Sequence, residues 1–110
     1  MRTFFRIVRA PTVEELDDGD FESDAAKGFP LPTDPIRASL HDGISVFNTE
    51  RQARNKALDY PFLGAYIAAI GVEEGAPDRF ERTLKGSPGH HTLRGEPSQI
   101  RKRVVSIVPV

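Results

Sequence analysis

The alternation of apolar and polar positions predicts a series of short strands with a few short helices between them. Residues 3–9 are rich in aromatic and β-branched side chains and contain no turn former, which predicts a strand. Because successive side chains of a strand point to opposite faces, Arg6 shares its face with the apolar Phe4 and Val8. A charge in such surroundings needs a partner, and Arg6 is therefore a candidate functional residue.

The most apolar segment of the chain is residues 65–72, where no side chain is charged and nearly all are aliphatic. This pattern is typical of a strand buried on both faces, and we expect it to be the central strand. Further strands are predicted at residues 44–48, 80–84, 91–94 and 103–110. Pro109 indicates that the last of them lies at a sheet edge. A loop is predicted at residues 73–77, and turns at 86–89 and 95–98.

Capping residues mark the predicted starts of three helices. Thr12–Glu15 and Thr49–Gln52 have the residue types of a capping box, in which two side chains satisfy each other's backbone amides. The helices that they predict run to about residues 18 and 59. Asp34 before Pro35 fits an N-cap followed by the first helical residue and predicts a brief helix through Leu40.

Length and composition limit the fold and exclude several kinds of chemistry. A chain of 110 residues with 38% hydrophobic residues can bury one core, so we expect a single domain over residues 1–110. Its class is α+β, with five or six strands in a mixed or antiparallel sheet and two or three short helices. Without cysteine the chain has no disulfide, no thiolate metal ligand and no cysteine nucleophile.

No membrane segment or export signal is expected. The apolar runs fall short of the roughly 18 to 20 residues that a helix needs to cross a bilayer. The apolar residues near Met1 are too few for the core of a signal peptide. We therefore expect a cytoplasmic protein.

The net charge of −1 conceals two segments of opposite sign. Residues 14–24 hold seven acidic side chains and no basic one, and we expect this stretch to be solvated. From Arg79 onward seven basic side chains stand against two acidic ones. The basic run 101–103 is a small footprint on a nearly neutral chain, so the sequence disfavours nucleic acid as a partner.

The residues that could carry chemistry are few. His90 and His91 are adjacent on a predicted strand and point to opposite faces, and His41 has no metal-ligand spacing to either, so no metal site is predicted. Ser45 follows a glycine but lacks the second glycine of a nucleophile elbow. No glycine-rich phosphate loop is present.

Three segments in a fixed order resemble the ADP-ribosyltransferase superfamily, in its small bacterial branches, which include tRNA 2′-phosphotransferases and some toxin domains. Residues 5–10 (FRIVRA) resemble the first-strand motif, in which an Arg or His binds the nicotinamide cofactor. Residues 43–53 (GISVFNTERQA) resemble the strand with Ser or Thr that leads into an alanine-rich helix. Residues 64–70 (GAYIAAI) resemble the apolar strand that follows. A small group of uncharacterised bacterial proteins of this fold is also similar.

The resemblance implies an ADP-ribosylation-like fold and a site for NAD or a related nucleotide, without a metal. The cofactor-binding residues that it implies are Arg6, Arg9, Ser45, Phe47, Thr49 and His90. In ADP-ribose transfer, Arg6 would hold a phosphate, and Ser45 or Thr49 would orient the ribose. The late glutamate of the superfamily has no clear counterpart in this chain. The resemblance gives its role to His91, so that His91 and Ser45 are the implied catalytic residues.

Two other functions stay open beside the transferase. The missing glutamate and the short chain are also compatible with a non-catalytic module that binds a protein partner through residues 14–24. Arg94 and the basic run 101–103 suggest a role in processing or binding RNA ends. A nucleotide, another small molecule or a protein is therefore the expected partner, and a membrane is not.

Overall fold

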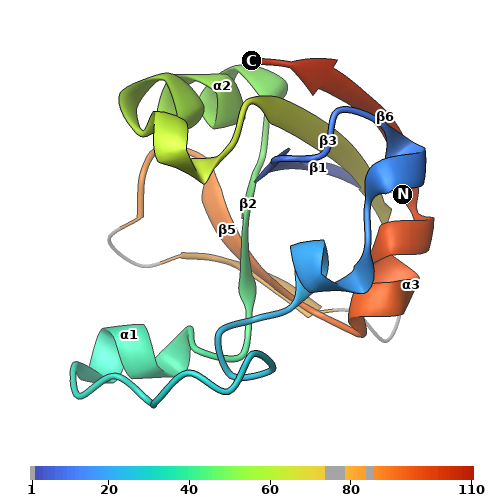
Figure 1. Ribbon diagram of the computed structural model, residues 1–110. Helices are drawn as coiled ribbons and strands as arrows, with labels where there is room; N and C mark the ends of the chain where they lie inside the picture. The colour runs from blue at the N-terminus through green and yellow to red at the C-terminus, as the bar shows by residue number, and fades with distance from the viewer. Residues whose placement is uncertain (1, 74–78, 84–85) are drawn as a thin grey trace.

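Within the described residues, six antiparallel strands form one sheet in the order β4-β5-β2-β1-β3-β6, which confirms the α+β class (Figure 1). The computed structural model describes residues 2–73, 79–83 and 86–110. The strands are β1 (Arg2–Val8), β2 (Ile44–Phe47), β3 (Tyr66–Val72), β4 (Arg79–Arg82), β5 (His90–Arg94) and β6 (Val104–Pro109). The α-helices are α1 (Pro35–Ser39), α2 (Glu50–Asp59) and α3 (Pro97–Lys102), and the 3-10 turns are η1 (Val13–Glu15), η2 (Asp18–Phe21) and η3 (Pro61–Leu63).

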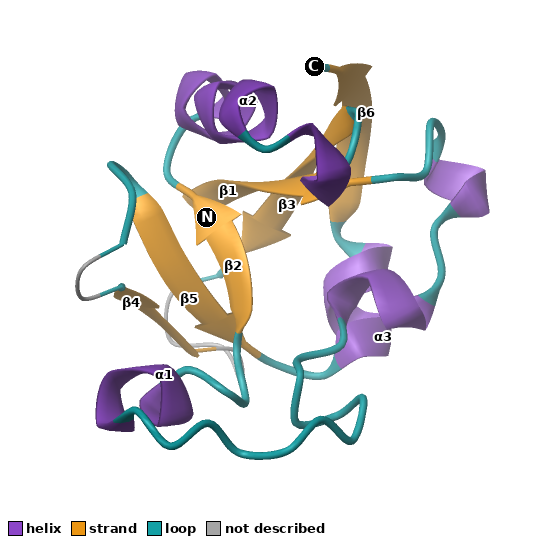
Figure 2. Cartoon of the chain, turned by 60° about the vertical axis from the view of Figure 1, so that its left-hand side comes forward, coloured by secondary structure: helices purple, strands orange, loops and turns teal. Residues whose placement is uncertain are grey.

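The sheet is divided into two halves that meet at one point. β1 pairs with β3 along its whole length, and β2 pairs with β5 along its whole length. Between β1 and β2, in contrast, a single residue pair is in register, Phe5 opposite Phe47. Figure 2 shows the two strands diverging from this contact. The sheet therefore forks, with β4-β5-β2 on one side and β1-β3-β6 on the other.

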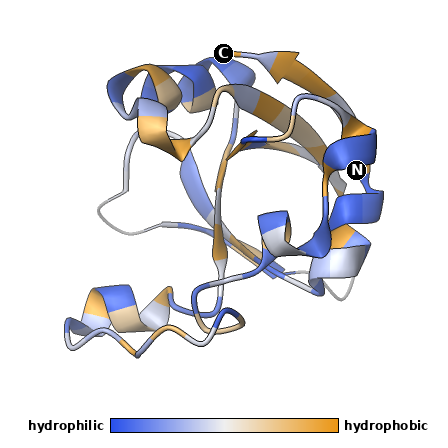
Figure 3. Ribbon diagram, in the orientation of Figure 1, coloured by the Kyte–Doolittle hydropathy of each residue, from blue (hydrophilic) through white to orange (hydrophobic). Residues whose placement is uncertain are grey.

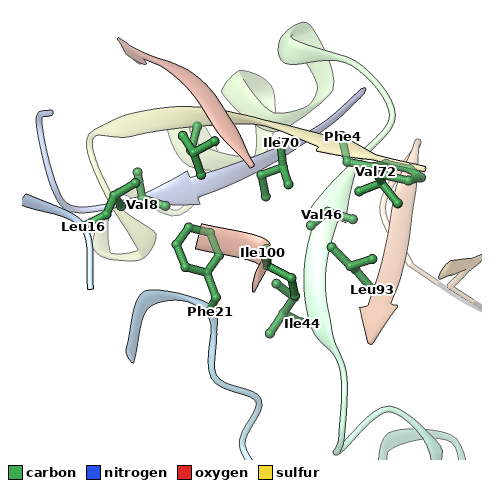
Figure 4. Close-up of a cluster of buried hydrophobic side chains, with 12 residues drawn as sticks. Phe4, Val8, Leu16, Phe21, Ile44, Val46, Ile70, Val72, Leu93 and Ile100 are labelled. Carbon is green, nitrogen blue, oxygen red and sulfur yellow. The ribbon is translucent and has the colours of Figure 1, made fainter. Parts of the chain in front are cut away.

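Two hydrophobic clusters cover the two faces of the sheet. The larger cluster takes side chains from both halves, and Phe21 of η2 and Ile100 of α3 close it (Figure 4). The smaller cluster contains Phe47, Ala53 of α2 and Ile67. The larger cluster thus holds the two halves of the sheet together where backbone pairing between them is minimal.

β3 is buried as predicted but is not the central strand. Its side chains from Ile67 to Val72 are buried, and Figure 3 shows the strand as largely hydrophobic. It lies between β1 and β6, while β2 and β1 occupy the centre of the sheet. Burial on both faces requires only that both clusters extend over β3, and they do. The prediction that the strand containing Pro109 is an edge strand is confirmed.

The first predicted helix is wrong, because residues 13–21 form two separate 3-10 turns. Leu16 and Phe21 are both buried, and a spacing of five residues does not place two side chains on one face of an α-helix. The Thr12 hydroxyl donates to the Glu15 carboxylate at 3.2 Å instead of capping the backbone. The capping box in this region is formed by Asp17 and Asp20.

The other helix signals are mostly confirmed. Thr49 and Gln52 form the predicted capping box of α2, and Asp34 caps α1 with Pro35 at the first position. The predicted turn at 95–98 is wrong in part, because α3 begins there at Pro97 and buries Ile100. Most of the predicted loop at residues 73–77, and the predicted strand end at Leu84, lie outside the described residues.

Replacing Gly64 by alanine is expected to lower the free energy of unfolding by about 3 kcal/mol, because strain and a steric clash combine there. The φ angle of Gly64 is 152°, and a Cβ atom would overlap the backbone carbonyl of Val8 in β1. Gly28→Ala is the control, since Gly28 has a φ of 83° but nothing within 4 Å of a Cβ. That variant should lose only about 1 kcal/mol in urea unfolding. Equal losses for the two variants would contradict the prediction.

Candidate functional site

The fork between β1 and β2 opens into a cleft of about 590 Å³, which we call the fork cleft. Its lining comes from β1, from residues 22–27, from the α1 region, from β2, from α2 and from the turn at 86–90. In Figure 1 the segment after η2 runs past β2 to α1, and the chain then turns back into β2. This path brings residues from the first third of the chain to this side of the sheet. The fork cleft therefore lies where the backbone pairing of the sheet is interrupted.

Arg6 bridges the two strands at the fork. Its Nε donates to the backbone carbonyl of Asp20 at 2.9 Å, and its Nη1 donates to the backbone carbonyl of Ser45 at 2.8 Å. The guanidinium thus supplies a hydrogen bond to β2 where β1 has moved away from it. This arrangement gives the partners that a charge on an apolar strand face requires.

Burial lowers the pKa of the Arg6 guanidinium to about 10, although the carboxylates of Asp20 and Asp24 oppose this effect. The side chain therefore keeps its charge at neutral pH. It contributes positive potential to the fork cleft, while two of its donor groups are already engaged by backbone oxygens.

Four of the predicted cofactor-binding residues line the fork cleft together: Arg6, Ser45, Phe47 and His90. The Ser45 side chain is exposed, and its hydroxyl has no hydrogen-bond partner among the described residues. The ring of buried Phe47 lies 5.3 Å from the His90 ring, at an angle of 45°. The pairing of Phe47 with His90 in adjacent strands places these two rings side by side.

His91 does not join this group, because it points to the opposite face of β5. Its ring lies 5.1 Å from the Phe4 ring in the region of the larger cluster. Its Nδ1 is 2.9 Å from the Gly89 carbonyl, which can only accept, so Nδ1 carries the proton. Nε2 then faces the Arg2 guanidinium at 3.5 Å. The structure therefore does not bring His91 together with Ser45.

Arg9 and Thr49 also lie outside the lining of the fork cleft. Arg9 Nη2 donates to the backbone carbonyl of Phe62 at 2.7 Å, which ties the end of β1 to η3. The Thr49 hydroxyl accepts from the Gln52 amide at 3.1 Å as the N-cap of α2. Both side chains are used by the fold itself.

Two histidines of the fork cleft have a ring nitrogen without a partner. The Nδ1 atoms of His41 and His90 are buried and make no hydrogen bond within the described part of the chain. The Nε2 of His41 is 2.9 Å from the carbonyl of Phe29. Burial lowers the pKa of His90 below its usual 6.5, and the charge of Lys56 lowers it further, followed by that of His91. His90 is therefore neutral at pH 7.

Sequence reasoning missed the other charged residues of the fork cleft, which are Lys27, Arg37, Lys56, Glu22 and Asp24. The two acids belong to residues 14–24, so the expectation that this stretch is merely solvated is wrong in part. Burial of Leu16 and Phe21 holds the stretch against the protein and carries its end into the cleft lining. Leu16 and Phe21 are therefore the signal in the sequence that could have indicated that this acidic stretch packs against the protein. Nothing in the sequence singles out Lys56.

Two arginines of the basic C-terminal third are held in ion pairs. Arg94 contacts Asp42 at 2.9 Å and Glu81 at 2.7 Å, and its hydrogen bond holds the pKa of Asp42 below the usual range. Arg101 Nε lies 2.6 Å from the Asp18 carboxylate. The acidic stretch and the basic end thus contact each other directly.

No group of three or more side chains that could hold a metal ion is found within residues 2–73, 79–83 and 86–110. Within the same ranges, no helix has the length and apolar character needed to cross a membrane.

The variant Arg6→Lys is expected to lower the free energy of unfolding by about 2 kcal/mol. A single ammonium cannot replace the planar guanidinium that donates to two carbonyls. Urea unfolding at pH 7 measures this loss. Arg51→Lys is the control, since Arg51 is exposed on α2 and should change stability by less than about 0.5 kcal/mol. A loss for Arg6→Lys no larger than that of the control would rule out the bridging role.

The lowered pKa of His90 predicts that acid destabilises the protein. The folded state binds this proton less tightly than the unfolded state, so stability is highest above pH 6.5 and falls as the pH drops below it. His90→Gln removes this contribution, and its free energy of unfolding should change less between pH 7.5 and pH 5.5 than that of the wild type. His41→Gln is the control for replacing a histidine of the fork cleft by glutamine. An unchanged pH dependence in His90→Gln would contradict the assignment.

Comparison with family models, curated proteins and solved structures finds no match to this chain.

Proposed function

We propose that the protein binds NAD or a related nucleotide in the fork cleft, on an ADP-ribosyltransferase-like fold. The observation that carries the proposal is the gathering of Arg6, Ser45, Phe47 and His90 around one cleft. These residues come from three strands that are distant in the sequence. The same four are among the residues that the resemblance to the superfamily implies for cofactor binding.

The size of the fork cleft suits a ligand of this kind. Pockets for small molecules and cofactors commonly measure about 300 to 1,000 Å³, and the fork cleft measures about 590 Å³. It also lies at the junction of two sheet halves, where backbone groups and side chains from several elements converge. A ligand there can contact many groups at once.

The charge of the fork cleft favours an anion. Its described lining contains four side chains that are cationic at neutral pH, namely Arg6, Lys27, Arg37 and Lys56. Glu22 and Asp24 are the carboxylates of the same lining. This excess of positive charge suits the phosphate groups of a nucleotide and opposes a cationic ligand.

The uncharged parts of the lining suit the remainder of a nucleotide. The half-buried His90 ring, supported from behind by buried Phe47, offers an aromatic surface against which a flat heterocyclic ring can pack. The exposed Ser45 hydroxyl can exchange hydrogen bonds with a ribose hydroxyl. The lining thus offers partners to a phosphate, a ribose hydroxyl and a heterocyclic ring, which are the chemical groups of a nucleotide.

We propose binding and not transfer of ADP-ribose. A transferase must stabilise the oxocarbenium-like charge that develops as nicotinamide leaves, and the resemblance gives this role to His91. His91 contacts Phe4, Arg2 and Gly89 instead of the fork cleft. The alternative of an RNA-binding surface loses weight because Arg94 and Arg101 are held in ion pairs.

Calorimetric titration with NAD tests the proposal. The wild type is expected to bind, and Ser45→Trp is expected to weaken binding by at least about tenfold, because the indole would fill the mouth of the cleft. Ser106→Trp is the matched control, since Ser106 is also an exposed strand serine but lies on β6, outside the cleft lining. If the wild type does not bind NAD, or if the two variants bind it with equal affinity, the proposal is wrong.

A further inference from the structure

We propose that Lys56, Ser87 and His90 form a phosphate-binding subsite in the wall of the fork cleft, which takes a phosphate or pyrophosphate group. The identity of the whole ligand rests on the proposed function, but the anion subsite is argued from these three residues alone. It lies where α2 meets the turn that leads into β5.

Lys56 provides an ammonium group that no carboxylate of the described residues neutralises. Its Nζ donates to the Ser87 hydroxyl at 3.0 Å and lies 4.4 Å from the centre of the Tyr60 ring. No acidic side chain of the described residues lies within ion-pair distance of it. Arg54, on the same helix, is paired with Glu50 at 3.1 Å. A half-buried cation in a cleft wall without an acidic partner favours binding of an anion.

Ser87 and His90 supply two further donors beside this ammonium. Because the Ser87 hydroxyl accepts its hydrogen bond from Lys56, its own proton is available for another acceptor. His90 lines the cleft, and its Nδ1 is buried, which leaves Nε2 as the nitrogen that can contact a ligand. A neutral imidazole protonated at Nε2 can donate to a phosphate oxygen.

The turn before β5 holds the His90 ring in place. A Cβ atom at Gly86 would lie 2.6 Å from His90 Nδ1, so only glycine lets the turn pack this closely against the ring. Gly89 has a φ of 76°, which permits the bend between Ser87 and His90. The His90 amide also donates to the Ser87 carbonyl at 2.9 Å. The two residues are thus fixed relative to each other before any ligand binds.

The electrostatics of the wall favour an anion beside Lys56 and His90. The charge of Lys56 contributes to the lowered pKa of His90, which means that the two groups act on each other. A phosphate beside both groups would offset the charge of Lys56 and so favour proton uptake by His90. Arg6 is less suited to the phosphate, because its Nε and Nη1 are engaged by the carbonyls of Asp20 and Ser45.

The test is a calorimetric titration of the full chain with inorganic pyrophosphate, with NAD and with adenosine. In Lys56→Met the affinity for pyrophosphate and for NAD is expected to fall by at least about tenfold, while any affinity for adenosine stays unchanged. Lys56→Arg keeps the charge and should retain most of the binding. Lys102→Met, an exposed lysine of α3, is the matched control and should bind as the wild type does.

The outcomes distinguish failure of the subsite from failure of the proposed function. If the wild type binds pyrophosphate but not NAD, and Lys56→Met binds neither, the subsite stands and the proposed function fails. If NAD binds equally to the wild type and Lys56→Met, the proposed function stands and the subsite is overturned. Failure of the wild type to bind pyrophosphate also overturns the subsite. Should Lys56→Met not fold, as judged by its circular dichroism spectrum, Ser87→Ala is titrated in its place and should also weaken pyrophosphate binding.

Discussion

The single contact between β1 and β2 is the constraint on which the rest of the structure depends. A sheet paired along its full length would leave no opening, because neighbouring strands lie about 4.8 Å apart. Here one register pair, Phe5 with Phe47, joins the β1-β3 pair to the β2-β5 pair, each of which is paired along the full length of β1 or β2. The hydrophobic cluster closed by Phe21 and Ile100 holds the halves together, and Arg6 satisfies a carbonyl beside the gap. The fork cleft is a consequence of this balance between packing and pairing.

Most elements could be predicted from the sequence because their signals are local. The aromatic and β-branched run of β1, the apolar run of β3 and the capping box at Thr49 each involve residues close in the chain. The order of the strands and the fork depend on contacts between distant segments. The 3-10 turns at residues 13–21 escaped prediction because tertiary burial of Leu16 and Phe21 overrides the capping signal there.

The sequence predicts those residues of the candidate site whose orientation follows from the alternation of side chains along a strand. Arg6 stood out because a charge shared a face with apolar neighbours, and its partners proved to be backbone carbonyls. Alternation also requires His90 and His91 to face apart, but the register with Phe47 decides that His90 faces the fork cleft. Lys56 and Glu22 reach the cleft through the paths of α2 and of the segment after η2, which no short motif encodes.

The position of β1 at the centre of the sheet sets an order of events during synthesis. β1 is synthesised before the other described strands, yet its full-length partner β3 begins at Tyr66 and its other neighbour, β2, begins at Ile44. Until residues 44–47 have been synthesised, β1 has neither of its neighbouring strands to pair with, and its full-length partner follows later still. Exposed unpaired strands of this kind promote association between nascent chains. The acidic stretch that follows β1 adds charge repulsion during this interval, so its solubilising effect is greatest before the fold exists.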